Sequence, residues 1–425
     1  MRQGNRGLRA LFALGGAAIL VAIAAGCGSG QTSGSDKEVS VIGTWADAEQ
    51  EAFMAMVKPW EDKTGNKVKY TGTRDLNAVL TTGVASGILP DLAGLPGPGQ
   101  LVEFAKAGAL KELDAVLDLN TYKAETSEAV ASIGIVDGKT YGVFIKTAVK
   151  GLIWYNPEVY SGGAPADFAA LMDTDPGDAD ALWCVGLESE AASGWPGTDW
   201  IEDILIRQSG AEVYDAWVAG EQKWTSPEVK AAFETFGEVL DNAHGDPEAM
   251  VSDGAGDFRN AGNPLFSAPP GCLFHHQANF ITTMFKENGG AQDGQFDFFV
   301  MPDIEPANAG SLTGAGDLFG LFSDKAAAKD LIKYLVTAEA QQIWVDRGGA
   351  ISANNKVTTY PDDVSKRSAD ALLAAKAFRF DASDLMPKAM NDAFWAAMLD
   401  FTVDQSKLDS ILSNLDEIQT SAYGG

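Results

Sequence analysis

EVSVIG at residues 38–43 begins the stretch that decides the fold, because this short β-forming run is followed at once by a helical pattern. Apolar residues recur at helical spacing within residues 53–60, and a second strand-like run, KVKY, follows at residues 67–70. A further helical stripe at residues 76–84 leads to ILPDLA at residues 88–93, which is typical of a buried strand. This β-α-β-α-β order predicts an α/β fold with a parallel sheet covered by helices.

The rest of the chain continues the mixture of strands and helices. YGVFIK at residues 141–146 and GLIWYN at residues 151–156 are two successive strand-like runs. The composition then changes, because residues 161–196 are rich in Gly, Pro and Asp, whereas the C-terminal part is mostly helical in pattern. The 425 residues are enough for two domains with substantial cores.

The first 26 residues have the parts of a secretory signal. Three arginines precede an uncharged apolar run at residues 11–25, which is shorter than the roughly 20 residues of a membrane-spanning helix. The small residues before Cys27 resemble a bacterial lipobox, although Ala24 stands where such motifs usually carry leucine. We therefore expect residues 1–26 to be a signal peptide and residues 27–35 a lipid-anchored flexible leash with Cys27 lipidated. Ordinary secretion with an unmodified Cys27 is the alternative.

The charge of the chain restricts its partners. The formal net charge is −28, with 59 acidic residues against 31 Lys and Arg. Such an acidic surface repels nucleic acid and anionic lipid, so we expect no nucleic-acid partner.

The cysteines and histidines suggest a disulfide rather than a metal site. Cys184 and Cys272 remain as an even pair outside the cytoplasm and predict one disulfide, with two free buried thiols as the alternative. No Cys-x-x-Cys pair exists, and His275 and His276 are adjacent instead of sharing one helical face, so we expect no metal and no other cofactor.

Several segments, taken together, resemble a known family. VSVIGTW, PWEDKTG and GILPDLAGLP near the start, YGVFIKTAVKGLIWYNPEVY in the middle and MNDAFWAAMLDF near the end resemble the extracellular solute-binding proteins of ABC sugar importers, the maltose-binding-protein class. The resemblance covers the mature chain in order. GTRDLNAVL, CLFHHQANF and FRFDASDLMP resemble the α-glucoside-binding members, whose ligands include maltose, trehalose and sucrose.

The resemblance implies a two-lobe periplasmic-binding-protein fold of type II, hinged, with the ligand in the interlobe cleft. Lobe 1 is expected to comprise residues 36–146 plus 310–349, and lobe 2 residues 147–309 plus 350–425. The implied protein is not an enzyme. It binds an α-linked di- or oligosaccharide and delivers it to ABC transporter permease subunits. We expect a monomer, held by its lipid anchor at the outer face of the cell membrane.

A sugar site needs flat aromatic faces for the C–H surfaces of the rings. Trp195 lies between Gly194 and Pro196 in a loop-like segment, where no periodicity explains a buried tryptophan, and the family carries a stacking aromatic there. The family also places a stacking tryptophan at the position of Trp395, although its neighbours suit a core helix equally well. Phe280 matches a third stacking position, and Trp45 follows the first strand.

A sugar site also needs polar groups for the hydroxyls. Arg74 and Asp75 follow the strand-like run KVKYTGT, where open α/β sheets place ligands, although a surface ion pair is the alternative. The remaining polar candidates are His276, Gln277, Asp317, Arg379 and Asp384, of which Arg379 and Asp384 could equally form a cap or an ion pair within one lobe. No residue is predicted to be catalytic.

Two other functions stay open. The same fold could bind a polyamine or another small solute, because acids and aromatic rings suit cations too. An exported glycosidase would need two carboxylates across one sugar bond, and with 59 acids such pairs are too common to be informative.

Overall fold

The structure is a computed structural model that describes residues 36–424. The expected signal peptide at 1–26, the leash at 27–35 and the lipidation site Cys27 lie outside the described residues.

The strands and helices follow the order that the sequence predicts for the N-terminal part. The strands are β1 (Glu38–Gly43), β2 (Lys67–Gly72), β3 (Leu92–Leu95), β4 (Ile135–Val136), β5 (Lys139–Thr140), β6 (Gly142–Val149), β7 (Leu152–Tyr155), β8 (Ala181–Cys184), β9 (Cys272–His276), β10 (Asp297–Val300), β11 (Ser311–Leu321) and β12 (Ala377–Phe380). The helices are α1 (Asp47–Thr64), α2 (Leu76–Ser86), α3 (Pro98–Lys106), α4 (Leu119–Thr126), α5 (Glu128–Ile133), α6 (Phe168–Met172), α7 (Trp195–Val218), α8 (Pro227–Asp241), α9 (Pro247–Met250), α10 (Ile281–Glu287), α11 (Ala326–Leu335), α12 (Ala338–Val345), α13 (Asp363–Ala374), α14 (Ala382–Leu385), α15 (Lys388–Val403) and α16 (Leu408–Tyr423).

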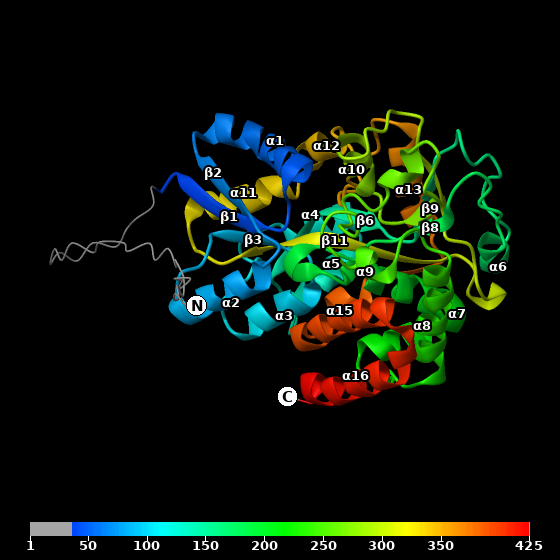
Figure 1. The fold of residues 1–425 in the computed structure, drawn as a ribbon. Coiled ribbons are helices and arrows are strands. Elements are labelled where there is room, and N and C mark those ends of the chain that lie inside the picture. Colours follow the sequence, from blue (N-terminus) through cyan, green and yellow to red (C-terminus); the bar gives the residue numbers. More distant parts are fainter. Residues whose placement is uncertain (1–35, 425) are drawn as a thin grey trace, which may run out of the picture. The chain divides into compact units, whose positions relative to one another are not determined.

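The first sheet has the strand order β12-β11-β3-β1-β2, and β6 pairs with β11. β1 is parallel to both β2 and β3, as the β-α-β-α-β pattern predicts. β11 runs antiparallel to β3 and β6, so the complete sheet is mixed. Its residues alternate between two cores, since Val39 and Val41 of β1 pack with α1 and α11, whereas Ile42 packs with α2 and α3. These helix pairs accordingly lie on opposite sides of β1 to β3 (Figure 1).

The second sheet has the order β10-β7-β9-β8. β7 runs antiparallel to both of its neighbours, and β8 is parallel to β9. Cys184 in β8 and Cys272 in β9 form a disulfide, so the predicted pairing is confirmed. The bond closes a separation of 88 residues, which in chain-entropy terms stabilises the fold by about 4 kcal/mol.

The chain passes directly from the first sheet to the second between β6 and β7, where only Lys150 and Gly151 intervene. It returns to the first sheet at β11. β12, within the segment 350–425 that was assigned to lobe 2, pairs in parallel with β11 of the first sheet. The lobe boundaries drawn from the sequence stay a prediction.

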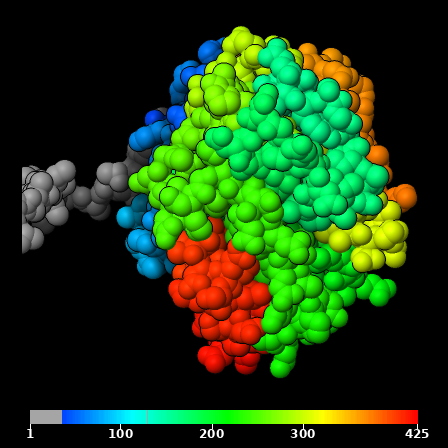
Figure 2. All heavy atoms as spheres, turned by 45° about the vertical axis from the view of Figure 1, so that its right-hand side comes forward, coloured from blue at the N-terminus to red at the C-terminus, as the bar shows by residue number. Residues whose placement is uncertain are grey.

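The C-terminal helices pack on the middle of the chain. α15 and α16 contact α7 and α8, and Figure 2 shows the C-terminal residues lying against the segment coloured green. Phe394 and Phe401 of α15 form edge-to-face pairs with Trp217 and Phe233, which join these helices in one core. Among residues 36–424, no helix combines the length and apolar character of a membrane span.

Candidate functional site

A cavity of about 650 Å³ lies beside the passage from β6 to β7, where Lys146, Ala148 and Lys150 line it. The residues that follow β1, β2 and β3 contribute Thr44, Arg74 and Pro96 to its lining. All three strands are parallel, so their carboxyl ends meet at one edge of the sheet, which is the position where open α/β sheets bind ligands. The opposite wall comes from the segment 190–195 and from α15.

Most of the predicted ligand residues line this cavity. They are Trp45, Arg74, Asp75, Trp195, Phe280, Asp317, Asp384 and Trp395. They come from segments far apart in the sequence, so the fold brings them together. Their role in binding stays a prediction.

Lys146 of β6 is buried at the cavity and is fully neutralised by acids. Its Nζ lies 2.7 Å from Glu49 Oε1 and 3.3 Å from Asp317 Oδ2. Burial alone would lower the pKa of Lys146, but the two carboxylates raise it above its ordinary value. The same Nζ lies 5.4 Å from the Trp45 ring centroid, and that ring is only 2% exposed. Trp45 is therefore mainly a core residue that shows an edge to the cavity.

Lys150, at the passage between the sheets, repeats this arrangement. Its Nζ lies 2.6 Å from Asp199 Oδ2 and 3.1 Å from Asp381 Oδ2, and 4.9 Å from the Trp195 ring centroid. Burial alone would lower its pKa, but these carboxylates raise it. Both lysines thus hold their charge in ion pairs with the protein, so neither offers a free charge to an anionic ligand.

Lys150 also affects whether a metal ion could bind to the carboxylates around it. Among residues 36–424, Asp199, Glu202 and Asp381 place carboxylate oxygens within 4.8 Å of one another. Lys150 already supplies the cation, and Glu202 accepts hydrogen bonds from the backbone N–H groups of Ala382 and Ser383 at 3.0 Å. The oxygens of this group are therefore occupied by protein donors.

Aromatic rings form one wall of the cavity. Trp195 packs edge-to-face on Phe258, with ring centroids 5.0 Å apart, and lies 6.0 Å from Phe280. Trp395 lines the cavity from α15. Gly194 connects the two tryptophans, because a Cβ there would lie 2.3 Å from the carbonyl oxygen of Trp395 and its φ is +109°. Only glycine therefore allows the Trp195 segment to approach α15 so closely.

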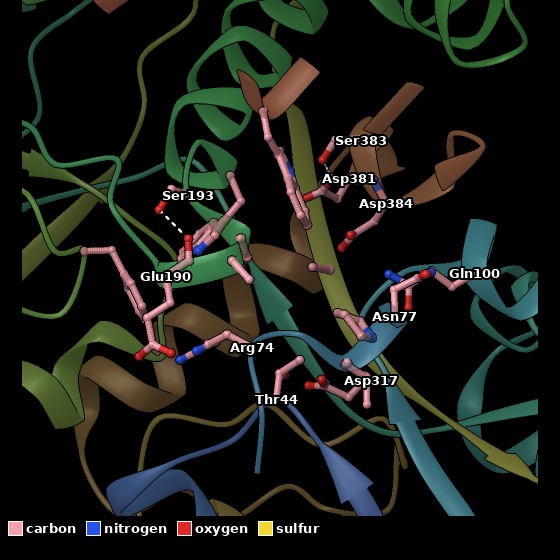
Figure 3. Close-up of a pocket in the computed structure, with 18 of the residues that line it drawn as sticks. Thr44, Arg74, Asn77, Gln100, Glu190, Ser193, Asp317, Asp381, Ser383 and Asp384 are labelled. Carbon is pink, nitrogen blue, oxygen red and sulfur yellow. Dashed lines mark hydrogen bonds between the residues drawn. The ribbon is translucent and has the colours of Figure 1, made fainter. Parts of the chain in front are cut away.

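Two groups of polar residues lie apart in the cavity (Figure 3). We call Arg74 and Glu190 the Arg74 end, and Asn77, Gln100 and Asp384 the Gln100 end. The Arg74 guanidinium lies 5.2 Å from the Phe258 ring centroid, and its side chain points toward that of Glu190. Asp384 points toward the side of the cavity that holds Asn77 and Gln100.

A family model described as bacterial extracellular solute-binding protein matches residues 55–374. This match covers about three quarters of the chain. The chain belongs to the bacterial extracellular solute-binding protein family. The predicted resemblance to solute-binding proteins is thereby confirmed.

Two curated relatives cover most of this solute-binding protein. The osmoprotective compounds-binding protein of Synechocystis sp. is 33% identical over 379 residues, which cover 86% of this chain and 88% of the relative. The alpha-glucosides-binding periplasmic protein of Rhizobium meliloti is 33% identical over 395 residues, which cover 87% of this chain and 84% of the relative.

Solved structures confirm the predicted two-lobe type II fold. A chitin oligosaccharide binding protein has a TM-score of 0.79 at 19% identity and covers 91% of this chain and 99% of its own. The GacH receptor of Streptomyces glaucescens has a TM-score of 0.71 at 17% identity, with 91% and 98% covered. At these identities the likeness shows the fold alone.

Three of the predicted ligand residues do not line the cavity. His276 Nε2 lies 2.8 Å from Asp203 Oδ2, and Asp203 also accepts from Arg207 and Thr313. Burial lowers the pKa of His276, although Asp203 partly offsets this effect. The ring thus belongs to an internal network with Asp203 and does not line the cavity.

Gln277 and Arg379 also make contacts within the protein and do not line the cavity. Gln277 is 1% exposed, and its Oε1 accepts from the backbone N–H of Ala278 at 2.8 Å. Arg379 in β12 forms a two-pronged ion pair with Asp215, at 2.5 and 2.7 Å. The sequence left open an ion pair as the alternative to a ligand role for Arg379, and the structure shows such a pair.

The sequence analysis missed several residues of the lining. Phe258 lies in a loop-rich segment, so the argument that singled out Trp195 could have found it. Asn77 and Gln100 sit in the first turns of α2 and α3, and no local pattern distinguishes them from ordinary surface amides. Only the packing of the helices reveals that they border a cavity.

Proposed function

We propose that this solute-binding protein captures an α-glucoside, such as maltose, trehalose or sucrose, for delivery to an ABC importer and does not transform it. The observation that carries the proposal is the cavity itself. Trp195, Phe258, Phe280 and Trp395 contribute aromatic rings to its lining, while Lys146 and Lys150 are already neutralised. Flat apolar surfaces with few free charges suit the C–H faces and hydroxyls of a neutral sugar.

The relatives support the ligand class. One is named for alpha-glucosides and the other for osmoprotective compounds, and each aligns over more than four fifths of this chain. In this fold a ligand acts by stabilising the closed arrangement of two lobes, and the importer recognises that form. The lobe boundaries predicted from the sequence belong to this proposal.

Thermal unfolding of the purified protein with single sugars tests the proposal. A ligand at a hundred times its Kd stabilises the folded state by about 2.7 kcal/mol, so maltose, trehalose or sucrose should raise Tm clearly. Spermidine and glucose 6-phosphate serve as charged competitors. A rise in Tm with spermidine but with no sugar would mean that the ligand is a polyamine. Release of reducing sugar from trehalose or sucrose would favour a glycosidase.

Trp395→Ala separates a binding role from a core role for that residue. Loss of a stacking ring should weaken sugar binding at least about tenfold, with a smaller effect on Tm in the absence of sugar. Phe394→Ala is the matched control, since Phe394 is fully buried and its loss should lower stability instead. An unchanged Kd in Trp395→Ala together with a large fall in Tm would place Trp395 in the core.

We also propose that the protein is exported and held at the outer face of the membrane through Cys27, which rests on the sequence of residues 1–35 alone. Cell fractionation with Cys27→Ala tests the tether. The wild-type protein should stay with the membrane, and the variant should appear in the soluble extracytoplasmic fraction. Equal distribution of the two would favour ordinary secretion.

A further inference from the structure

The Gln100 end of the cavity contains buried polar atoms that have no partner among residues 36–424. Gln100 is 6% exposed, and its Oε1 is buried without a hydrogen bond. The Nδ2 of Asn77 and the Nε1 of Trp395 are in the same state, and all three residues line the cavity. Buried polar atoms in native proteins nearly always have a partner, so unpaired ones at a cavity wall point to a ligand.

Asp384 adds a carboxyl group to this end. Within the described residues, no donor or cation lies within bonding distance of its side-chain oxygens, whereas its backbone N–H donates to Asp381 Oδ1 at 3.1 Å. Burial, together with the neighbouring charge of Asp381, raises the pKa of Asp384 well above its ordinary value. The group is thus desolvated, and the charge of Lys150 offsets this cost only in part.

Backbone contacts hold the segments that carry Gln100 and Asp384 close together. α3, which carries Gln100, packs directly on the segment that carries Asp384, because a Cβ on Gly99 would lie 2.1 Å from the carbonyl oxygen of Met386. The backbone N–H of Lys388 also donates to Glu103 Oε1 at 2.9 Å. The backbone positions of Gln100 and Asp384 are therefore fixed relative to each other, so this end of the cavity is preformed.

The hydrogen-bonding capacity of these four groups indicates which class of ligand can satisfy all of them. Asn77 Nδ2 and Trp395 Nε1 can only donate, whereas Gln100 Oε1 can only accept. The Asp384 carboxyl group accepts, and because its pKa is raised it also donates while it holds its proton. An ammonium group only donates, so a polyamine would leave the two donors unpaired. A phosphate or carboxylate only accepts, so it would leave Gln100 unpaired and face Asp384. A sugar hydroxyl both donates and accepts, so adjacent hydroxyls satisfy both kinds of group.

We propose that the Gln100 end is a hydroxyl-reading subsite, in which Asn77, Gln100 and Asp384 select a terminal unit with free adjacent hydroxyls over Trp395. This inference rests on the proposed function and sharpens it, because it names the part of the ligand that determines selectivity. Ligands that lack a hydroxyl at this unit, or carry a methyl ether there, are discriminated against, since the buried groups stay unpaired.

Isothermal titration with trehalose, maltose and sucrose tests the subsite. Gln100→Met keeps the length of the side chain but removes the acceptor, and Asn77→Leu removes the donor. Each should weaken the binding of the best of the three sugars by tenfold or more, and Tm without sugar should stay level or rise, because an unpaired buried polar atom is gone. Gln208→Met is the control for affinity, since Gln208 Oε1 is also buried and unpaired but does not line the cavity. Its Tm is not compared, because Gln208 Nε2 donates to Thr235 Oγ1 at 2.7 Å.

A second titration series varies the sugar instead of the protein. It measures the binding of monodeoxy analogues of the best sugar to the wild-type protein. At least one analogue should bind tenfold or more weakly to the wild type, and its penalty should shrink in Gln100→Met or Asn77→Leu. Affinities within twofold of wild type in both variants, or equal binding of all analogues, would overturn the subsite while leaving sugar binding intact. Absence of binding by every sugar would instead overturn the proposed function.

Discussion

The two ends of the cavity are built differently. At the Gln100 end, backbone packs on backbone through Gly99 and Met386, and short side chains face the cavity from fixed positions. At the Arg74 end, two long charged side chains face each other, and in the described part of the chain no carboxylate lies within 4.0 Å of the Arg74 guanidinium. Glu190 instead pairs with Arg259 at 3.6 Å, and its side chain is 58% exposed. An end with a fixed backbone can select one ligand unit, whereas an end of long, partly exposed side chains can adapt to the remainder.

The largest effect should come from removing the buried charge beside the Gln100 end. Lys150→Met leaves Asp199 and Asp381 without their cation, which should cost about 3–5 kcal/mol of stability. Urea unfolding measures this loss. Lys230→Met, which breaks an exposed pair with Asp409, is the control and should cost less than about 1 kcal/mol. Similar losses in the two variants would mean that the buried pair contributes no more than a surface pair.

The next largest effect should follow from separating α3 from the Asp384 segment. Gly99→Ala places a methyl group 2.1 Å from the carbonyl oxygen of Met386, which should cost about 1–3 kcal/mol and weaken sugar binding at least tenfold. Calorimetric unfolding and titration measure both. Lys106→Ala, at the exposed end of the same helix, should change neither. Unaltered affinity in Gly99→Ala would show that the Gln100 end does not depend on this packing.

The carboxyl group of Asp384 should make stability depend on pH in a definite direction. Because its pKa is raised in the folded state, the folded protein holds this proton over a range where the unfolded chain has lost it. Stability should therefore fall as pH rises from the ordinary pKa of 3.8 toward the raised value. Asp384→Asn should remove this part of the fall in urea unfolding from pH 4 to 8, whereas Asp75→Asn near the Arg74 end should not. Parallel wild-type and Asp384→Asn profiles would contradict the assignment.

The smallest effect is expected at the Arg74 end. Arg74→Met removes a partly exposed charge, so the Kd of the best disaccharide should change less than about fivefold. Any change should shrink between 50 and 500 mM NaCl, because salt screens exposed charges. A loss of tenfold or more that persists in high salt would reverse the comparison and make Arg74 a selective contact.

The sequence predicted what local periodicity encodes. The strands and helices of residues 38–106 follow from alternating patterns, because each element there buries one face against a neighbour in the chain. Arg74 and Asp75 were found for the same reason, since they follow a strand of a parallel sheet. β12 lies beside β11 and Arg379 beside Asp215 only through long-range packing, which leaves no local pattern.

The amides of the Gln100 end mark the limit of sequence reasoning. Gln100 and Asn77 look like surface residues at the starts of helices, and only the glycines at 97 and 99 hint that something approaches α3 closely. His276 and Gln277 show the opposite case, because their side chains suit hydroxyls but do not line the cavity. His276 contacts Asp203, and Gln277 accepts from the backbone N–H of Ala278. Chemical suitability alone therefore does not identify a contact residue.

β11 constrains how this protein could be redesigned or diverge. Thr313 binds Asp203 in the interior, while Asp317, four residues further along the strand, lines the cavity beside Lys146. A deletion or insertion of one residue between them would flip one of these side chains to the other face of the sheet. New ligand preferences should accordingly arise through substitutions in the first turns of α2 and α3, and length changes in β11 should be rare among functional descendants.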